Sequence, residues 1–172
     1  MRTRASVVVD RASDQVFDAV ARGLFATYHL WNTAVVDVRE ADGAAAGAPV
    51  HQGSRGIAVQ YLRRGKKYRD FGRTFQVTRL VEGRELELRG ETSEGALGAY
   101  RTRVLFDALG ARTRITVQTD AEFTLPFLLI GWPIVRLRSG FELRANLRRL
   151  RAALEAPALP PPPQRPSGAP LV

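Results

Sequence analysis

The sequence of 172 residues contains no cysteine, only two histidines and a single methionine. Without cysteine the chain can form no disulfide, no thiolate metal site and no cysteine nucleophile. The two histidines, His29 and His51, are too few for a histidine-rich metal centre. We therefore expect no metal, no cofactor, and a fold that is stabilised by packing alone in a reducing cytosol.

The sequence also lacks a long apolar run. Its most apolar stretch, Phe123 to Val135, is interrupted by Pro126, Gly131 and Pro133, and a membrane-spanning helix needs about 20 apolar residues. The N-terminal residues contain no apolar core of the length that a signal peptide requires. We expect a cytoplasmic protein without a membrane-spanning segment.

Motifs of the common catalytic sites are missing too. The chain has no GxSxG elbow, no P-loop and no GxGxxG, so hydrolase, nucleoside-triphosphatase and dinucleotide-binding functions have no motif behind them. His29 lies beside Tyr28 and near Trp31, where it could act as an acid or a base. An isolated histidine is more often a surface or capping residue.

The composition indicates one globular domain. Hydrophobic residues make up 45% and charged residues 25% of the chain, which is ordinary for a folded protein and excludes a disordered one. The net charge is +9, and Lys66 and Lys67 are the only lysines among the 26 basic residues. Arginine suits contact with anions, but a GC-rich coding sequence would produce the same bias.

The N-terminal third predicts one strand and two short helices. Thr3 to Asp10 alternates and is rich in valine, as a strand is. Ser13 is placed to cap a following helix, which Gly23 ends or bends. Leu24 to Trp31 predicts a second short helix or an irregular turn.

The middle of the chain predicts an antiparallel meander. Ala41 to Gly53 predicts a flexible loop, and short turn-like runs separate the later strands. Together with the first strand, six further segments give seven strands: Thr33 to Glu40, Ser54 to Arg63, Tyr68 to Leu80, Glu85 to Glu91, Ala99 to Phe106 and Thr113 to Phe123. Their alternation indicates a sheet with one covered face and one face in water.

A long amphipathic helix follows. Leu143, Leu147, Leu150 and Leu154 recur at helical spacing. Since proline disfavours helix in the residue before it, we expect Leu125 and Trp132 to be non-helical or to sit at kinks, and the rigid helix to start near Val135. The segment Phe123 to Leu137 would then be a mobile gate that contacts a membrane, or else a static apolar plug.

This order of elements is similar to that of the START-like, or SRPBCC, superfamily, which includes polyketide cyclases/dehydrases and lipid-transport proteins. Val7 to Val20 resembles that family's first strand and capped helix, Trp31 falls where its members often carry an aromatic residue, and Phe106 to Val117 resembles its last hairpin. The resemblance covers about residues 3 to 155. It implies an α+β helix-grip fold, in which a curved seven-stranded antiparallel sheet surrounds a long C-terminal helix, with two short helices between the first two strands.

The resemblance also implies a ligand cavity between the sheet and the helix. We assign the START-like domain to residues 1–156 and a disordered, proline-rich tail to residues 157–172. Simple core packing is the alternative role for each residue that we predict in the cavity wall. The predicted wall residues are Trp31, Val59, Tyr61, Phe75, Leu88, Tyr100, Thr102, Val104, Phe106, Ile115, Val117, Trp132 and Phe141.

Three functions stay open at this point. The first is binding, with or without transport, of a hydrophobic or amphipathic small molecule such as a lipid, a quinone or a polyketide-like aromatic. The second is a cyclase or dehydratase that uses the same cavity, with Tyr61, Glu91, Tyr100 or Arg101 moving protons. The third is association with RNA or an anionic membrane through the basic turn Arg63 to Lys67. No RNA-binding signature is present, so nucleic acid is disfavoured, and we expect a monomer or a weak homodimer.

The proline-rich tail leads to a first prediction. Residues 156–172 contain seven prolines and no apolar periodicity, and such sequence supplies neither helix donors nor a buried face. Deleting residues 158 to 172 should leave the melting temperature unchanged, as measured by circular dichroism. A loss of several degrees would show that the tail packs on the domain.

Overall fold

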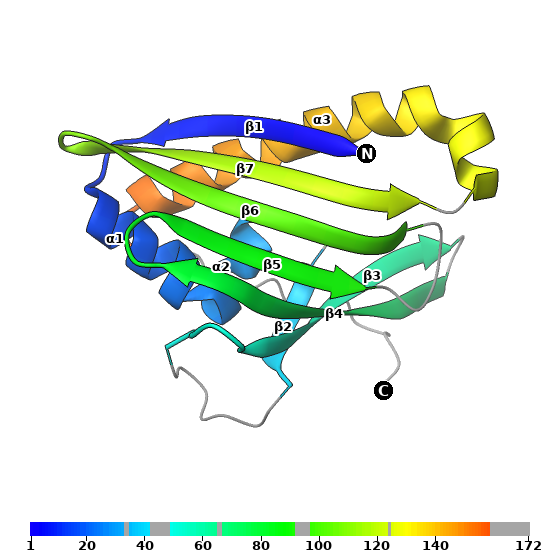
Figure 1. Ribbon diagram of the computed structural model, residues 1–172, viewed down its shortest axis with the longest axis horizontal. Coiled ribbons are helices and arrows are strands. Elements are labelled where there is room, and N and C mark those ends of the chain that lie inside the picture. Colours follow the sequence, from blue (N-terminus) through cyan, green and yellow to red (C-terminus); the bar gives the residue numbers. More distant parts are fainter. Residues whose placement is uncertain (33–34, 42–48, 65–66, 92–96, 124, 159–172) are drawn as a thin grey trace.

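In the computed structural model, the chain forms a seven-stranded antiparallel sheet, with helices at one end and across one face (Figure 1). The structure describes residues 1–32, 35–41, 49–64, 67–91, 97–123 and 125–158, and only the backbone of residues 36, 37, 39, 60–64, 67–72, 91, 97, 123 and 125–138. The elements are β1 (Arg2–Val9), α1 (Ser13–Phe17), the π-helical η1 (Asp18–Arg22), α2 (Leu24–Trp31), β2 (Val35–Glu40), β3 (Arg55–Arg64), β4 (Lys67–Val81), β5 (Glu85–Glu91), β6 (Leu97–Leu109), β7 (Arg112–Phe123) and α3 (Leu125–Glu155).

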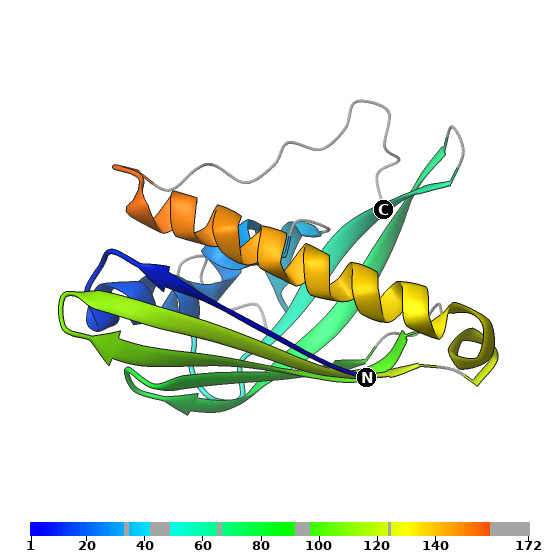
Figure 2. The same ribbon diagram turned by 90° about the horizontal axis from the view of Figure 1, so that it is seen from above.

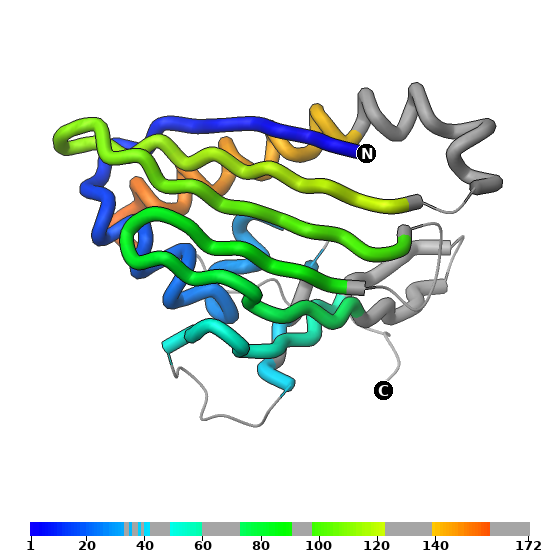
Figure 3. Tube along the Cα trace, viewed as in Figure 1, coloured from blue at the N-terminus to red at the C-terminus, as the bar shows by residue number. Residues whose placement is uncertain are grey.

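The sheet confirms the predicted meander. Strand order is β1-β7-β6-β5-β4-β3-β2, so β1 and β2 form the two edges, and the chain passes from one edge to the other through α1, η1 and α2. Figure 3 follows the chain through the hairpins. Gly83 and Gly110 have φ angles of 64° and 68° in the turns before β5 and β7, a conformation that glycine adopts without strain.

Different helices cover different parts of the sheet. α1 contacts β6 and β7, α2 packs on β2 and α3, and α3 lies along β1. Figure 2 shows α3 crossing one face of the sheet, as the helix-grip fold requires. The predicted fold class is therefore confirmed.

The core lies between this inner face and the helices. Strand alternation buries Leu86, Leu88, Val104 and Ile115 completely. From the other side, α3 contributes a stripe at helical spacing, of which Leu147 and Leu150 are fully or almost fully buried.

The predicted N-cap at Ser13 is wrong. Ser13 is already the first residue of α1, and the extended Ala12, with φ −64° and ψ 151°, is the N-cap. No side chain caps this helix, and the Asp14 carboxylate instead accepts a hydrogen bond of 2.8 Å from the backbone N–H of Gln15. A cap must have extended backbone for its side chain to reach the N–H groups of the first turn, and Ser13 is helical.

The predicted helix start near Val135 is also wrong, because α3 begins at Leu125. Pro126 is its second residue, and a helix tolerates proline there since the first N–H groups have no intrahelical acceptor. The predicted flexible loop and the predicted tail are described only in part, because residues 42–48 of the loop and residues 159–172 of the tail lie outside the described part of the chain. Among the described residues, no helix is long and apolar enough to span a membrane.

The outer face carries a charge cluster around Glu87. Its carboxylate accepts hydrogen bonds from Arg103 Nε at 2.8 Å and from the Thr78 hydroxyl at 2.9 Å, and Arg89 and Arg101 lie 3.5 and 3.7 Å away. Burial acts to raise the pKa of Glu87, but these hydrogen bonds and the positive charge of Arg103 and Arg89 outweigh it and hold the pKa below its usual value. The cluster thus ties β4, β5 and β6 together across the outer face.

Glu87→Gln should destabilise the protein near neutral pH by about 1 kcal/mol, a modest value because the arginines are partly exposed to solvent. A lowered folded-state pKa gives stability that is present above the unfolded value of about 4.3 and is lost as the pH falls through the folded value. The difference in the free energy of unfolding between the variant and the parent should therefore shrink as the pH is lowered into the acid range. Urea unfolding at several pH values would measure it. Glu82→Gln is the control, since Glu82 pairs with Arg22 at 2.7 Å but is 68% exposed. An equal loss in both variants would contradict a special role of Glu87.

Candidate functional site

The inner face of the sheet changes from apolar to polar along β6 and β7. At the end near α1, Phe106 pairs with Ile115 and Val104 pairs with Val117. Towards the other end, Thr102 pairs with Thr119, and their hydroxyls lie 3.2 Å apart. The sequence predicts this change, because every second residue of each strand faces inwards and these residues change from apolar to polar along β6 and β7.

A pocket of about 330 Å³ lies over the polar end of this face, between the sheet, the end of α2 and α3. We call it the inner pocket. Its walls are formed by Met1, Thr3, Tyr28, Trp31, Asn32, Arg73, Tyr100, Thr102, Val117, Thr119, Ala121, Ser139, Glu142, Leu143 and Asn146.

Tyr28 and Trp31 form an aromatic wall of the inner pocket, which is supported from the core by Phe75. Tyr28 stacks on Phe75 with ring centroids 5.4 Å apart, and it meets Trp31 edge to face with ring centroids 4.7 Å apart. Phe75 also lies against Phe25, with centroids 6.1 Å apart. Aromatic contacts of this geometry hold the rings in place, so the wall is pre-formed.

Two glycines make room for these rings. A Cβ on Gly56 would lie 2.4 Å from Phe75 Cζ, and a Cβ on Gly90 would lie 2.5 Å from Tyr100 Cζ. The two aromatic side chains therefore lie over neighbouring strands at positions where any other residue would push them away. The positions of Phe75 and Tyr100 depend on these two glycines as much as on their own strands.

The inner pocket offers several hydrogen-bond donors. Within the described part of the chain, the buried Trp31 Nε1 has no hydrogen-bond partner, and the buried Tyr100 hydroxyl makes no hydrogen bond of normal geometry, with Tyr28 as its polar neighbour. Buried polar atoms in proteins are nearly always paired, so these two groups have hydrogen-bonding capacity left for a ligand oxygen. Arg73 adds a guanidinium to the same pocket.

Burial raises the pKa of both tyrosines, which are protonated at neutral pH even at the ordinary tyrosine value of about 10. It raises the pKa of Tyr100 far above its usual value, and the neighbouring Tyr28 adds to the rise while Arg73 acts against it. Burial likewise raises the pKa of Tyr28 and lowers that of Arg73, which still stays charged because an arginine begins so high. Both phenols thus present O–H donors at neutral pH, but a group with so high a pKa is a poor proton donor for catalysis.

The predicted wall residues divide into several groups. Trp31, Tyr100, Thr102 and Val117 line the inner pocket. A second set is buried in the adjoining core and does not line it: Phe75, Leu88, Val104, Phe106 and Ile115.

Two predicted wall residues lie elsewhere. Val59 alternates with the inward-facing Ala58, which is 1% exposed, so it lies on the opposite face of β3. Phe141 is 60% exposed on α3. The side chains of Tyr61 and Trp132 lie outside the described residues.

The sequence prediction missed several polar wall residues. Arg73 lies two positions before the inward-facing Phe75 and Thr119 two after Val117, so strand alternation could have identified both. Glu142 and Asn146 are four residues apart on α3, beside the apolar stripe that was predicted. Arg101, which was considered as a proton-transfer group, faces outwards and lies 3.7 Å from Glu87.

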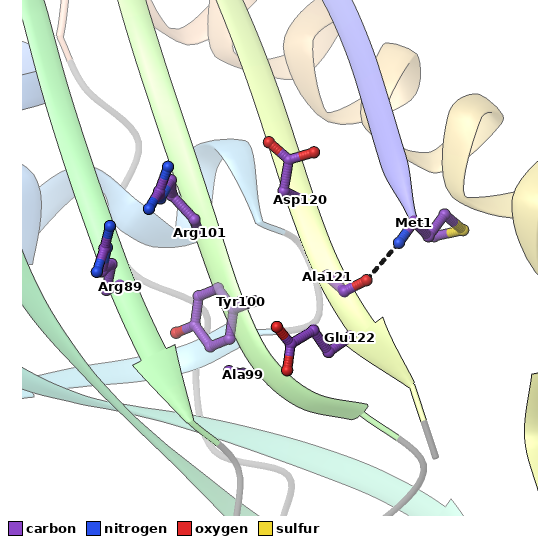
Figure 4. Close-up of a pocket in the computed structure, with 8 residues that line it drawn as sticks. All are labelled: Met1, Arg89, Ala99, Tyr100, Arg101, Asp120, Ala121 and Glu122. Carbon is purple, nitrogen blue, oxygen red and sulfur yellow. Dashed lines mark hydrogen bonds between the residues drawn. The ribbon is translucent and has the colours of Figure 1, made fainter. Parts of the chain in front are cut away.

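A second hollow lies at the ends of β5, β6 and β7 (Figure 4). This outer cleft has a volume of about 310 Å³, and Arg89, Arg101 and Asp120 lie side by side in the register of the three strands. The N-terminal amino group of Met1 donates a hydrogen bond to the Ala121 carbonyl at its border. Asp120 also accepts a hydrogen bond of 2.7 Å from Arg2, so its charge is matched within the chain. Among the described residues, no group of three or more histidine, cysteine or acidic side chains is placed to hold a metal ion.

Residues 1–155 match the family described as "Polyketide cyclase / dehydrase and lipid transport". The chain belongs to this family. The match covers the sheet and all of α3, and it agrees with the START-like resemblance of the sequence. No curated protein matches the sequence.

Solved structures share the fold of this family member. A START superfamily protein from Mycobacterium smegmatis superposes with a TM-score of 0.65 at 18% identity, over 90% of this chain and 97% of that one. The di-domain ARO/CYC protein BexL of the BE-7585A biosynthetic pathway gives 0.62 at 15% identity, over 91% and 48%. A truncated norcoclaurine synthase from Thalictrum flavum gives 0.59 at 9% identity, over 87% and 92%. At these identities the likeness is one of fold.

Gly90→Ala tests the placement of Tyr100 in this family member. The new Cβ would lie 2.4 Å from the Thr74 carbonyl oxygen as well as 2.5 Å from the Tyr100 ring, so we expect a loss of about 1–3 kcal/mol in the free energy of unfolding. Gly98→Ala is the matched control, because its nearest atom would be 3.7 Å away. Urea unfolding and the near-ultraviolet circular dichroism of tyrosine would measure both. If the two variants are equally stable, the ring does not lie over Gly90.

Proposed function

We propose that this protein binds a hydrophobic or amphipathic small molecule, such as a lipid, a quinone or a polyketide-like aromatic, in the inner pocket. The observation that carries the proposal is the combination of a pre-formed aromatic wall with the buried Tyr100 hydroxyl and Trp31 N–H. A pocket with an apolar lining and a few convergent polar groups is the usual form of a small-molecule site. Membership of the family supports the same function.

The size and chemistry of the inner pocket limit the classes of ligand that it can bind. A volume of about 330 Å³ is at the lower end of the range for drug-sized ligands, which favours a compact ring system or a single acyl chain over a two-chain lipid. Tyr28, Tyr100 and Trp31 can all donate hydrogen bonds, and Arg73 is cationic. The polar end of the ligand should therefore carry acceptor oxygens, as a quinone, a phenolic ketone or a carboxylate does.

Cyclase or dehydratase chemistry in the same pocket is the second candidate. Its support is the likeness in fold to BexL, a di-domain ARO/CYC protein, and the presence of Tyr28 and Tyr100 in the pocket lining. The raised pKa of Tyr100 argues against it, since efficient general acids have a pKa close to the working pH. Binding without chemistry therefore stands as the primary proposal, in a cytoplasmic protein that could deliver its ligand at an anionic membrane surface.

Filling the pocket should abolish binding. Thr102 is 7% exposed and lines the inner pocket, so Thr102→Trp would occupy space that a ligand needs, at a cost in stability of about 1–3 kcal/mol. Asp107→Trp is the control on the same strand, because Asp107 is exposed and does not line the inner pocket. We expect an apolar fluorophore to bind at least tenfold more weakly to Thr102→Trp, by about 1.4 kcal/mol, and normally to Asp107→Trp.

Native mass spectrometry of the protein purified from its own host would identify the ligand. The same ligand should displace the fluorophore from the parent protein. Circular dichroism must show that Thr102→Trp is folded. Unaltered fluorophore binding by the folded variant would place the ligand outside the inner pocket.

A further inference from the structure

A groove of about 510 Å³ runs along an open edge of the sheet and shares no lining residue with the inner pocket. It is lined by the four consecutive β1 residues from Arg4 to Val7 and by Arg144, Leu147, Arg148 and Arg151 of α3. Successive side chains of a strand point to opposite faces. A groove that touches four of them in a row therefore lies along the edge of β1, and we call it the β1–α3 groove.

Some backbone N–H and C=O groups of β1 point outwards from this edge, away from β7. Met1 exchanges two hydrogen bonds with Ala121, and β1 and β7 then pair in unbroken register as far as Val9. In an antiparallel ladder every second residue bonds to the partner strand, so Arg4 and Ser6 point their N–H and C=O groups away from β7. Within the part of the chain that the structure describes, no strand lies beyond β1.

The groove is strongly basic. Arg4, Arg144 and Arg148 are exposed and form no ion pair with the acidic residues that the structure describes. Arg151, by contrast, donates to Glu155 at 3.0 Å. Three uncompensated guanidinium groups therefore face the groove, above a floor to which Ala5 and Val7 of β1 and Leu147 of α3 contribute apolar atoms.

We propose that the β1–α3 groove binds an acidic peptide segment of a partner protein as an additional strand. Backbone groups of β1 would supply the strand pairing, as in other complexes formed by strand addition. Arg4 would meet acidic side chains on the outer face of the added strand, and Arg144 and Arg148 would meet those that face α3.

Charge decides between the possible occupants of the groove. A second copy of this chain would bring its own Arg4 to the shared edge, and like charges placed opposite each other repel. The C-terminal segment of the chain is no better suited, since residues 156–172 contain seven prolines and no acidic residue, and proline cannot donate to a strand ladder. An acidic peptide can pair with the backbone groups at the open edge of β1 and also with the arginines of the groove.

The test uses the full chain and a fluorescein-labelled synthetic peptide of glutamate, aspartate and threonine, long enough to lie beside Arg2 to Val8. Fluorescence anisotropy would measure binding to the parent protein, to Arg148→Glu and to Arg149→Glu. The last two variants change the charge equally at adjacent positions, but only Arg148 lines the groove. We expect Arg148→Glu to bind about tenfold more weakly, and Arg149→Glu to bind within about twofold of the parent.

N-methylation of alternate peptide residues tests the strand pairing without altering the protein. One set of positions would face β1 and the other would face away, so methylating one set should abolish binding and methylating the other should not. Equal effects of the two sets, equal losses in Arg148→Glu and Arg149→Glu, or undiminished binding of a peptide with glutamine at every acidic position would each overturn the proposal. Binding to phosphatidylserine vesicles with no binding of the peptide would assign the groove to a membrane instead.

Discussion

The structure depends on one constraint: a single long helix and two short ones must cover the inner face of a seven-stranded sheet. α1 and α2 cover one end, where the inward residues are apolar, and α3 lies along β1. So few helices do not fill the space over the sheet completely, and the inner pocket remains between the sheet, the end of α2 and α3. There the inward side chains change to threonine, tyrosine and arginine, because a hollow that admits water or a ligand tolerates polar groups that a packed core excludes.

The chemistry of the inner pocket follows from how its aromatic rings are held. Gly56 and Gly90 leave space on the sheet for Phe75 and Tyr100, and Tyr28 then stacks on Phe75. The same burial raises the pKa of both phenols, which stay neutral O–H donors. Rigid, neutral donors favour selective binding of an oxygen-bearing ligand, because little conformational entropy is lost when the ligand enters.

The arginines of this chain serve more than one purpose. Arg103, Arg89 and Arg101 surround Glu87 on the outer face, where they link neighbouring strands. Arg4 and Arg148, in contrast, face a groove that holds no matching acid among the described residues. Net charge gave no hint of this division, since a count of charges does not record which of them are already paired.

The sequence by itself determined the strands, the two short helices, the amphipathic C-terminal stripe and hence the fold class, because these follow from local periodicity and turn residues. β5 was predicted to the residue, and the family resemblance came from the order of the elements. Only the tertiary structure decided which residues meet in the inner pocket. Pairing with β4 fixes the face of β3 on which Val59 lies. Arg73 of β4, Tyr28 of α2 and Tyr100 of β6 line the same pocket although they belong to three different elements. β1 has one open edge because β7 pairs with its other edge. Each of these depends on contacts between residues far apart in the chain, which local spacing does not specify.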